Sequence, residues 1–365
     1  MKSYLLSALG ILLIATGCER NQNSNRKLGD GLEALFSPPQ SYVIAHTNLP
    51  PTIDGNLDEP AWRWAEWTSS FCDIEGYGKP DPYYATRAKM MWDSTCLYIA
   101  ARLWDKHIWA TLTERDQIIY ADNDFEVFID PGNTGHNYYE LEVNAHNTMF
   151  DLFLTQPYRS NAHILISWNC SGLRHAVAIT GTLNDPTDED QGWTVEMAIP
   201  FKDLAATPKD GDVWRLNFSR VEWDTHIVDG KYVKKTDEHG KTLPEHNWVW
   251  SPTGMIDMHM PERWGYVQFS ALAPDATQPL FEWPYSEQQR QYLWLVFYKQ
   301  QKHYRDKGAY ALSLSDLSIA SSCLVSGKRN TLSLSATPLQ FTATISDDSG
   351  AALRINHEGL IRKIR

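Results

Sequence analysis

Residues 42–270 consist mostly of short runs of β-forming residues separated by turn residues, and this pattern restricts the fold more than any other feature. Turn-forming loops such as DPGNTG (130–135) and NDPTDEDQG (184–192) punctuate the runs. Many short strands with few helical stretches predict a mainly β fold, an antiparallel β-sandwich of the jelly-roll or immunoglobulin-like kind. Ten runs fit strands: 42–47, 85–92, 97–105, 125–131, 138–145, 149–154, 176–183, 192–200, 214–223 and 264–270.

The C-terminal part has a different pattern. Residues 272–283 are punctuated by proline and suit a linker. The segment that follows predicts a helix that starts at Pro284 and stops at Gly308. Three strand candidates then lead to a basic tail, so residues 284–365 are predicted to form a small α+β appendage whose sequence shows no recognisable active site: 331–336, 341–346 and 351–356.

The N-terminus predicts export. Residues 1–17 combine Lys2, an apolar run and small residues, which is typical of a signal peptide too short to span a bilayer. The sequence Ala-Thr-Gly-Cys resembles a lipobox and predicts lipidation at Cys18. Glu19 after it indicates the outer membrane, on either its periplasmic or its outer face. Residues 18–40 are polar and then rich in proline, which predicts a tether ahead of a sandwich over 41–271.

Charge and cysteine content exclude several classes. The formal net charge of −12 argues against nucleic acid and anionic membrane surfaces as partners, which leaves the lipid as the expected membrane contact. No CxxC pair is present, so neither a zinc ribbon nor a thioredoxin-like site is indicated. Buried free thiols are the favoured interpretation, although three disulfide pairings remain open for Cys72, Cys96, Cys170 and Cys323.

Sequence motifs of common enzymes are missing from the chain. GxSxG, HExxH, GxxxxGK[ST] and GxGxxG do not occur, and no two histidines show metal-ligand spacing. No catalytic residue is therefore assigned from a motif.

The segment 124–144 places carboxylates on one side of a predicted hairpin. Side chains alternate between faces along a strand, so Asp124 and Glu126 share one face while Phe125, Val127 and Ile129 share the other. After the turn, Glu140, Glu142 and Asn144 share a face in the same way. Pairing of the two strands would bring Glu126 close to Glu142, with the acids on an open outer face of the sandwich.

Three interpretations of these acids remain open. They form a solvated face, or a row of acceptors for sugar hydroxyls, or a catalytic pair of a glycoside hydrolase with Glu126 and Glu142 as acid and base. A hydrolase also needs an apolar pocket that separates the two pKa values, and no such pocket can be located in the sequence.

Flat rings beside such acceptors would favour sugar binding. Trp109 and Tyr120 fall in the polar loop 105–124, where exposure of both rings is expected. Other tryptophans are assigned to the core: Trp62, Trp92, Trp193 and Trp214.

The order of the motifs resembles the family 9-like carbohydrate-binding modules over about 230 residues. The matching segments are IDGNLDEPAWRWAEW (53–67), MMWDSTCLYIAARLWD (90–105), NDFEVFIDPGN (123–133), YYELEVNAHNTMFD (138–151), GWTVEMAIPFKDL (192–204), WRLNFSRVEW (214–223), WSPTG (250–254) and HMPERWGYVQFS (259–270). The resemblance implies a β-sandwich with structural calcium and a sugar site between two aromatic rings.

The resemblance also assigns roles to residues. Tyr120 takes the place of the first ring, Glu126 matches the strand acid, and Asn144 matches an asparagine of the next strand. Glu142 stands where the family has arginine, and the second ring falls near Met258 and His259, where no tryptophan stands. The resemblance carries the fold, and these departures leave the sugar unspecified.

Calcium, the cofactor that the resemblance implies, needs six to eight oxygen ligands. Candidate ligands are Asp105, Asp122 and Asp124, together with the acidic loop 184–191, and none of them has EF-hand spacing.

The leading hypothesis is a lipid-anchored, non-catalytic protein that binds poly- or oligosaccharide and presents it to a glycan-degradation system. One alternative is a glycoside hydrolase, because the family accompanies xylanases. The other is a structural or assembly lipoprotein that binds protein partners.

Overall fold

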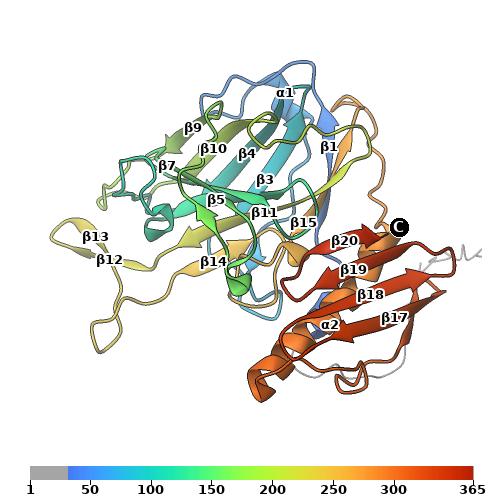
Figure 1. Cartoon of the computed structure of the whole chain (residues 1–365). Coiled ribbons are helices and arrows are strands. Elements are labelled where there is room, and N and C mark those ends of the chain that lie inside the picture. The colour runs from blue at the N-terminus through green and yellow to red at the C-terminus, as the bar shows by residue number, and fades with distance from the viewer. Residues whose placement is uncertain (1–31, 365) are drawn as a thin grey trace, which may run out of the picture.

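The computed structural model describes residues 32–364, which form a β-sandwich followed by a smaller unit of one helix and one sheet (Figure 1). The predicted signal peptide, Cys18 and the first part of the predicted tether lie outside the described residues. Among the described residues, no helix is long and apolar enough to cross a membrane.

The larger sheet contains 13 strands, and all ten strands predicted from the sequence are confirmed. Its main path runs in the order β8, β7, β6, β5, β11, β15, β1, β3, β4, β10 and β9, while β14 pairs with β11 and carries β2. The strands are β1 (Ser41–His46), β2 (Cys72–Asp73), β3 (Thr86–Trp92), β4 (Cys96–Trp104), β5 (Asp124–Asp130), β6 (Tyr138–Asn144), β7 (Met149–Leu154), β8 (Ile164–Leu165), β9 (Arg174–Thr180), β10 (Gly192–Pro200), β11 (Val213–Glu222), β14 (His246–Val249) and β15 (Gly265–Ser270).

Pairing within this sheet is antiparallel, as predicted, except at β1. That strand pairs in parallel with both β15 and β3, and so joins the two halves of the sandwich into one hydrogen-bonded sheet. The sheet curls on itself, and its inner face carries the apolar residues of each alternating strand, such as Phe125, Val127 and Ile129 of β5. The four tryptophans assigned to the core are all buried: Trp62, Trp92, Trp193 and Trp214.

Shorter elements connect the strands. They are α1 (Pro60–Arg63), the 3-10 helices η2 (Ile119–Ala121), η3 (Tyr158–Ser160) and η4 (Pro261–Arg263), and a separate two-stranded hairpin of β12 (Thr225–Val228) and β13 (Lys231–Lys234). The cysteines are unpaired, as the favoured interpretation of the sequence predicted. Cys72, Cys96, Cys170 and Cys323 are free thiols, and the first three are buried.

The C-terminal unit consists of α2 (Tyr285–Lys307) and a five-stranded antiparallel sheet. The predicted helix is confirmed, and Gly308 ends it with a φ of +73°, a conformation that glycine adopts without strain. The sequence missed β16 and also β20, which lies in the predicted basic tail. The strands of this sheet are β16 (Ser322–Val325), β17 (Lys328–Ala336), β18 (Phe341–Asp347), β19 (Ala352–Asn356) and β20 (Ile361–Ile364).

Part of the predicted tether belongs to this C-terminal unit. Leu32–Phe36 form the 3-10 helix η1, and Leu35 is buried in the apolar cluster between α2 and the smaller sheet. Phe36 packs edge-on against Tyr292 of α2. The described end of the segment is therefore packed rather than extended.

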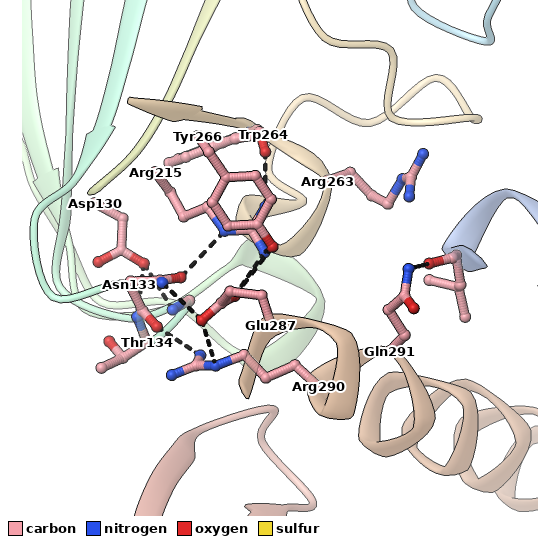
Figure 2. Close-up of polar contacts among 12 residues, drawn as sticks. Asp130, Asn133, Thr134, Arg215, Arg263, Trp264, Tyr266, Glu287, Arg290 and Gln291 are labelled. Carbon is pink, nitrogen blue, oxygen red and sulfur yellow. Dashed lines mark hydrogen bonds and ion pairs between the residues drawn. The ribbon is translucent and has the colours of Figure 1, made fainter. Parts of the chain in front are cut away.

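A buried ion pair joins the two units (Figure 2). Glu287, in the first turn of α2, accepts hydrogen bonds from Arg215 Nη2 at 3.2 Å and from the Tyr266 hydroxyl at 3.0 Å. Its other oxygen lies 3.1 Å from Arg290 Nε and accepts from Asn133 Nδ2. Both members of the Arg215–Glu287 pair are about 5% exposed, so each depends on the other for compensation of its charge.

Replacing Glu287 with alanine tests this interface. Glu287→Ala leaves the Arg215 guanidinium buried without its carboxylate, so we expect the free energy of unfolding to fall by about 3–5 kcal/mol. Urea denaturation followed by circular dichroism measures the change. The matched control is Glu282→Ala, because Glu282 is exposed and should change stability by less than about 0.5 kcal/mol. Equal midpoints for the two variants would contradict the role of the pair.

Candidate functional site

The candidate site is formed by outward-facing side chains of the two paired strands β5 and β6. The strands pair with Asp124 opposite Asn144 and Glu126 opposite Glu142, as the sequence predicted, and Phe128 lies opposite Glu140. Because successive side chains point to opposite faces, these residues all share the outer face of the sheet, while Phe125 and its alternates fill the core. One register therefore builds both the core and the site.

The acids are not on an open face, which corrects the sequence-based expectation. Asp124, Glu126, Glu140 and Glu142 are exposed by 0%, 6%, 5% and 3%. The outer face of the hairpin is covered by segments that come from elsewhere in the chain. The carboxylates consequently lie in a pocket of low polarity, where each charge is costly.

The cover leaves a cavity of about 470 Å³ over the hairpin. Glu126, Glu140 and Glu142 form its polar floor, while the walls are mainly apolar and aromatic. The remaining lining residues are Ile118, Tyr120, Phe128, Phe150, Leu152, Tyr158, Ile164, Ile166, Val221, Asn247, Met258 and His259. A cavity of this size suits a small ligand such as a sugar ring.

The four acids interact mainly with one another. Asp124, Glu126 and Glu142 each offer a carboxylate oxygen within 4.8 Å of the others. Burial raises the pKa of Glu126 to about 7. Burial, with the charge of Glu126 added, also raises the pKa of Asp124, Glu140 and Glu142 well above the ordinary value. Within residues 32–364, no lysine or arginine forms an ion pair with any of the four.

His259 lies at the edge of the floor. Its Nε2 is 4.0 Å from Glu140 Oε2, and its Nδ1 is 2.9 Å from the Tyr138 hydroxyl. Burial lowers the pKa of His259 to about 3, and Arg159 adds to the effect, so the ring is neutral at pH 7. Tyr158 packs edge-on against the ring with centroids 4.3 Å apart. The histidine therefore supplies shape and a hydrogen bond to the wall, not a positive charge.

Four of the six predicted ligand-binding residues meet in this cavity: Tyr120, Glu126, Glu142 and His259. Tyr120 is 46% exposed at the rim, and its backbone N–H donates to Glu142 Oε2 at 3.0 Å. The bond joins the rim loop to the floor.

The other two predicted residues lie elsewhere. Trp109 is only 5% exposed, so the expectation that its polar loop would expose the ring is wrong. Asn144 is completely buried, and its side chain donates to the Leu112 carbonyl and to Asp122 Oδ2 while accepting from the Thr148 N–H. It fixes the turn after β6 and does not line the cavity.

Two of the three acids predicted to hold calcium are occupied by protein groups. Asp105 pairs with Arg220 at 3.0 Å. Asp122 accepts from the Thr111 and Leu112 N–H groups, from the Thr111 hydroxyl and from Asn144. Neither carboxylate therefore fits a calcium ion without losing these bonds. Asp124 differs, because its Oδ2 is buried and has no hydrogen-bond partner.

Sequence reasoning missed part of the site. Alternation had placed Glu140 on the same face as Glu142, but Glu140 was not named as a ligand-binding residue. Extending the alternation to β7 would have added Phe150 and Leu152, since Phe150 pairs with Glu142 and Leu152 with Glu140. Tyr158, Ile164 and Ile166 gave no signal, because they lie in η3, in the two-residue strand β8 and in the turn after it. Elements this short leave no periodic pattern, and their path over the hairpin depends on tertiary contacts.

The C-terminal unit supports the wall that Tyr158 and His259 form. Arg159 Nη1 donates to the His259 carbonyl at 2.9 Å, and its Nη2 pairs with Glu262 at 2.8 Å. The other oxygen of Glu262 accepts from the Tyr298 hydroxyl of α2. The Arg159 guanidinium also lies 5.6 Å from the ring centre of Trp294. A chain of contacts thus runs from α2 to the cavity wall.

A model of the family described as carbohydrate family 9 binding domain-like matches residues 53–269, more than half of the chain. The chain belongs to this family. The resemblance inferred from the motifs is thereby confirmed, and the match ends before α2 begins.

Three similar proteins illustrate the family. Exoglucanase XynX of Acetivibrio thermocellus is 26% identical over 222 residues, which are 61% of this chain and 16% of that protein. Endo-1,4-beta-xylanase A of Thermoanaerobacterium saccharolyticum is 28% identical over 204 residues, or 56% of this chain and 14% of that protein. A family 9 module from Caldicellulosiruptor kristjanssonii in complex with cellotriose is 15% identical, with 67% of this chain and all of that chain covered and a TM-score of 0.43. The chain spans only a small part of the two enzymes.

Crowding of the acids gives a stability prediction. Glu142→Gln removes one buried charge and keeps an oxygen that can accept from the Tyr120 N–H. At pH 8 in EDTA we expect the free energy of unfolding to rise by about 1 kcal/mol or more, because the repulsion from Glu126 and Glu140 is relieved. Denaturant titration measures the change. Glu189→Gln, on a side chain that is 71% exposed, is the control, and a loss of stability in Glu142→Gln alone would contradict the prediction.

Proposed function

We propose that this chain is a non-catalytic carbohydrate-binding protein whose β5–β6 cavity takes part of a poly- or oligosaccharide. The observation that carries the proposal is an acidic floor under an apolar, aromatic wall in a cavity of about 470 Å³. Carboxylates accept hydrogen bonds from sugar hydroxyls, and charged acceptors form the stronger bonds. The C–H faces of a sugar ring can pack on the side chains of the wall.

The rim offers two exposed rings for such packing. Tyr120 and Tyr158 both line the cavity and are 46% and 48% exposed, from segments on either side of the hairpin. Tyr120 holds the position that the family resemblance assigns to the first ring. The family resemblance places the second ring near Met258 and His259, where this chain has no tryptophan. Tyr158 is our candidate for that ring.

The hydrolase alternative receives less support from the same geometry. The Glu126 and Glu142 oxygens are close enough for a retaining pair, for which about 5 Å is usual. A hydrolase, however, keeps one carboxyl group protonated and the other ionised by giving them different environments. Here burial raises the pKa of both groups, and Glu126 and Glu142 share one floor. We therefore propose binding without turnover.

A glycan array with the chain from residue 19 onward, followed by calorimetry on the best ligand, tests the proposal. Tyr120→Ala and Tyr158→Ala should each weaken binding at least about tenfold, equivalent to about 1.4 kcal/mol. The control is Tyr77→Ala, a tyrosine that is 67% exposed and does not line the cavity. Sugar release that Glu126→Gln abolishes would support the hydrolase instead, and no glycan signal would favour the structural lipoprotein.

We further propose that a lipid at Cys18 anchors the protein, on the outer membrane, beside a glycan-degradation system. The support is the sequence alone: the apolar run before Cys18 and the Glu19 after it. Cys18→Ser should move the protein from the membrane fraction to the soluble fraction and abolish labelling with a radioactive fatty acid. An unchanged distribution would contradict the anchor, and Cys323→Ser serves as the matched control.

A further inference from the structure

The floor of the cavity groups four buried carboxyl groups that no cationic side chain of the described protein pairs with. Asp124, Glu126, Glu140 and Glu142 are at least 94% buried, and no arginine or lysine of residues 32–364 pairs with them. Two other buried acids of this chain do have a cationic partner: Asp105 has Arg220, and Glu262 has Arg159. Buried carboxylates are normally paired with a cation or bound to a metal.

Two oxygen atoms at the floor have no hydrogen-bond donor at all. Asp124 Oδ2 and Glu140 Oε2 are both buried and without a partner, although buried polar atoms are almost always satisfied. Glu140 also lines the cavity, and its free oxygen lies 4.0 Å from His259 Nε2, beyond hydrogen-bonding distance. The free oxygen of Glu140 is an observation separate from the close grouping of Asp124, Glu126 and Glu142, and both observations point to a ligand that binds carboxylate oxygen atoms.

The spacing of the oxygens fits one metal ion. Asp124, Glu126 and Glu142 each present an oxygen within 4.8 Å of the others. Calcium binds oxygen at about 2.3–2.6 Å, so two oxygens on one calcium ion can be up to about 5 Å apart. Magnesium, at about 2.0–2.1 Å, demands near-ideal octahedral geometry and usually keeps several of its waters. Three protein carboxylates in one group therefore suit calcium better, since its shell of oxygen ligands is larger and more flexible.

The chain's second group of close acids makes a useful contrast. Glu196 lies near Asp54 and Glu59, yet both of its oxygens are occupied: one accepts from the Asp54 and Gly55 N–H groups and the other from Trp62 Nε1. Those bonds tie the segment before α1 to β10. No such set of donors compensates the acids of the cavity floor.

We propose that Asp124, Glu126 and Glu142 hold one calcium ion at the floor of the cavity, with Glu140 beside it, and that hydroxyl groups of the bound sugar complete its coordination. Glu126 and Glu142 line the cavity and Asp124 does not, so an ion held by all three would have one side toward the ligand. Three carboxylates leave positions open in a shell of six to eight oxygens. The part about the sugar rests on the proposed function; the ion site does not.

The first experiment measures the ion without any sugar. The chain from residue 19 onward is stripped with EDTA, titrated with CaCl₂ by calorimetry, and analysed for bound calcium after dialysis. Asp124→Asn and Glu142→Gln should each lose one ion per chain relative to the parent, or bind it at least about tenfold more weakly. Glu189→Gln, in the acidic loop 184–191, is the matched control and should leave the count unchanged.

Two results would overturn the site. One is that the parent protein gives no heat and binds no ion at millimolar CaCl₂. The other is that both variants bind as many calcium ions per chain as the parent does. Circular dichroism shows whether each variant is folded, and the Glu142→Gln side chain keeps the size of the original. Heat from glucosamine oligomers, without heat from CaCl₂, would assign the floor to an organic cation and would also overturn the metal.

The second experiment couples the ion to the sugar. With a glycan from the array, binding should be lost in EDTA and restored by CaCl₂. A bound ion with glycan binding unchanged in EDTA would overturn the coordinating role of the sugar. If no glycan binds under any condition, the proposed function fails, while the calcium count of the first experiment still decides the ion site.

Discussion

The register between β5 and β6 is the constraint on which the rest of the site depends. With Glu126 opposite Glu142, one face of the hairpin is acidic and the other supplies Phe125, Val127 and Ile129 to the core. A slip of one residue would turn the acids into the core and the apolar residues outward, at a large cost in free energy. The stability of the sandwich therefore also enforces the geometry of the floor.

Burial is what turns a row of acids into a site. On an open face the same carboxylates would be solvated and would repel one another weakly through water. Under the cover of η2 and the segment around Tyr158, they lie in a medium of lower polarity, so any group of opposite charge or any good hydrogen-bond donor is attracted strongly. In the proposed function, the apolar cover thus strengthens the polar contacts of a ligand without touching each of them.

Much of the fold could be predicted from the sequence, because alternation and turn residues are local signals. The hairpin of Glu126 and Glu142 is the clearest case, and α2 with its glycine stop is another. The burial of the acids could not be predicted, since their cover comes from short elements and turns before and after the hairpin, whose positions are set by tertiary contacts. The prediction for Trp109 was wrong in the same direction: its polar loop was expected to expose the ring, which is buried.

The part of the chain that matches the family is shorter than the part that its buried contacts hold together. The family match stops at residue 269, but two arginines inside it depend on residues beyond it. Arg215 pairs with Glu287 of α2. Arg159 pairs with Glu262, which accepts a hydrogen bond from Tyr298 of α2. A fragment cut at the limits of the match would expose Arg215 and remove the support behind Tyr158. A graft of this module into another protein therefore has to carry α2 and its sheet along.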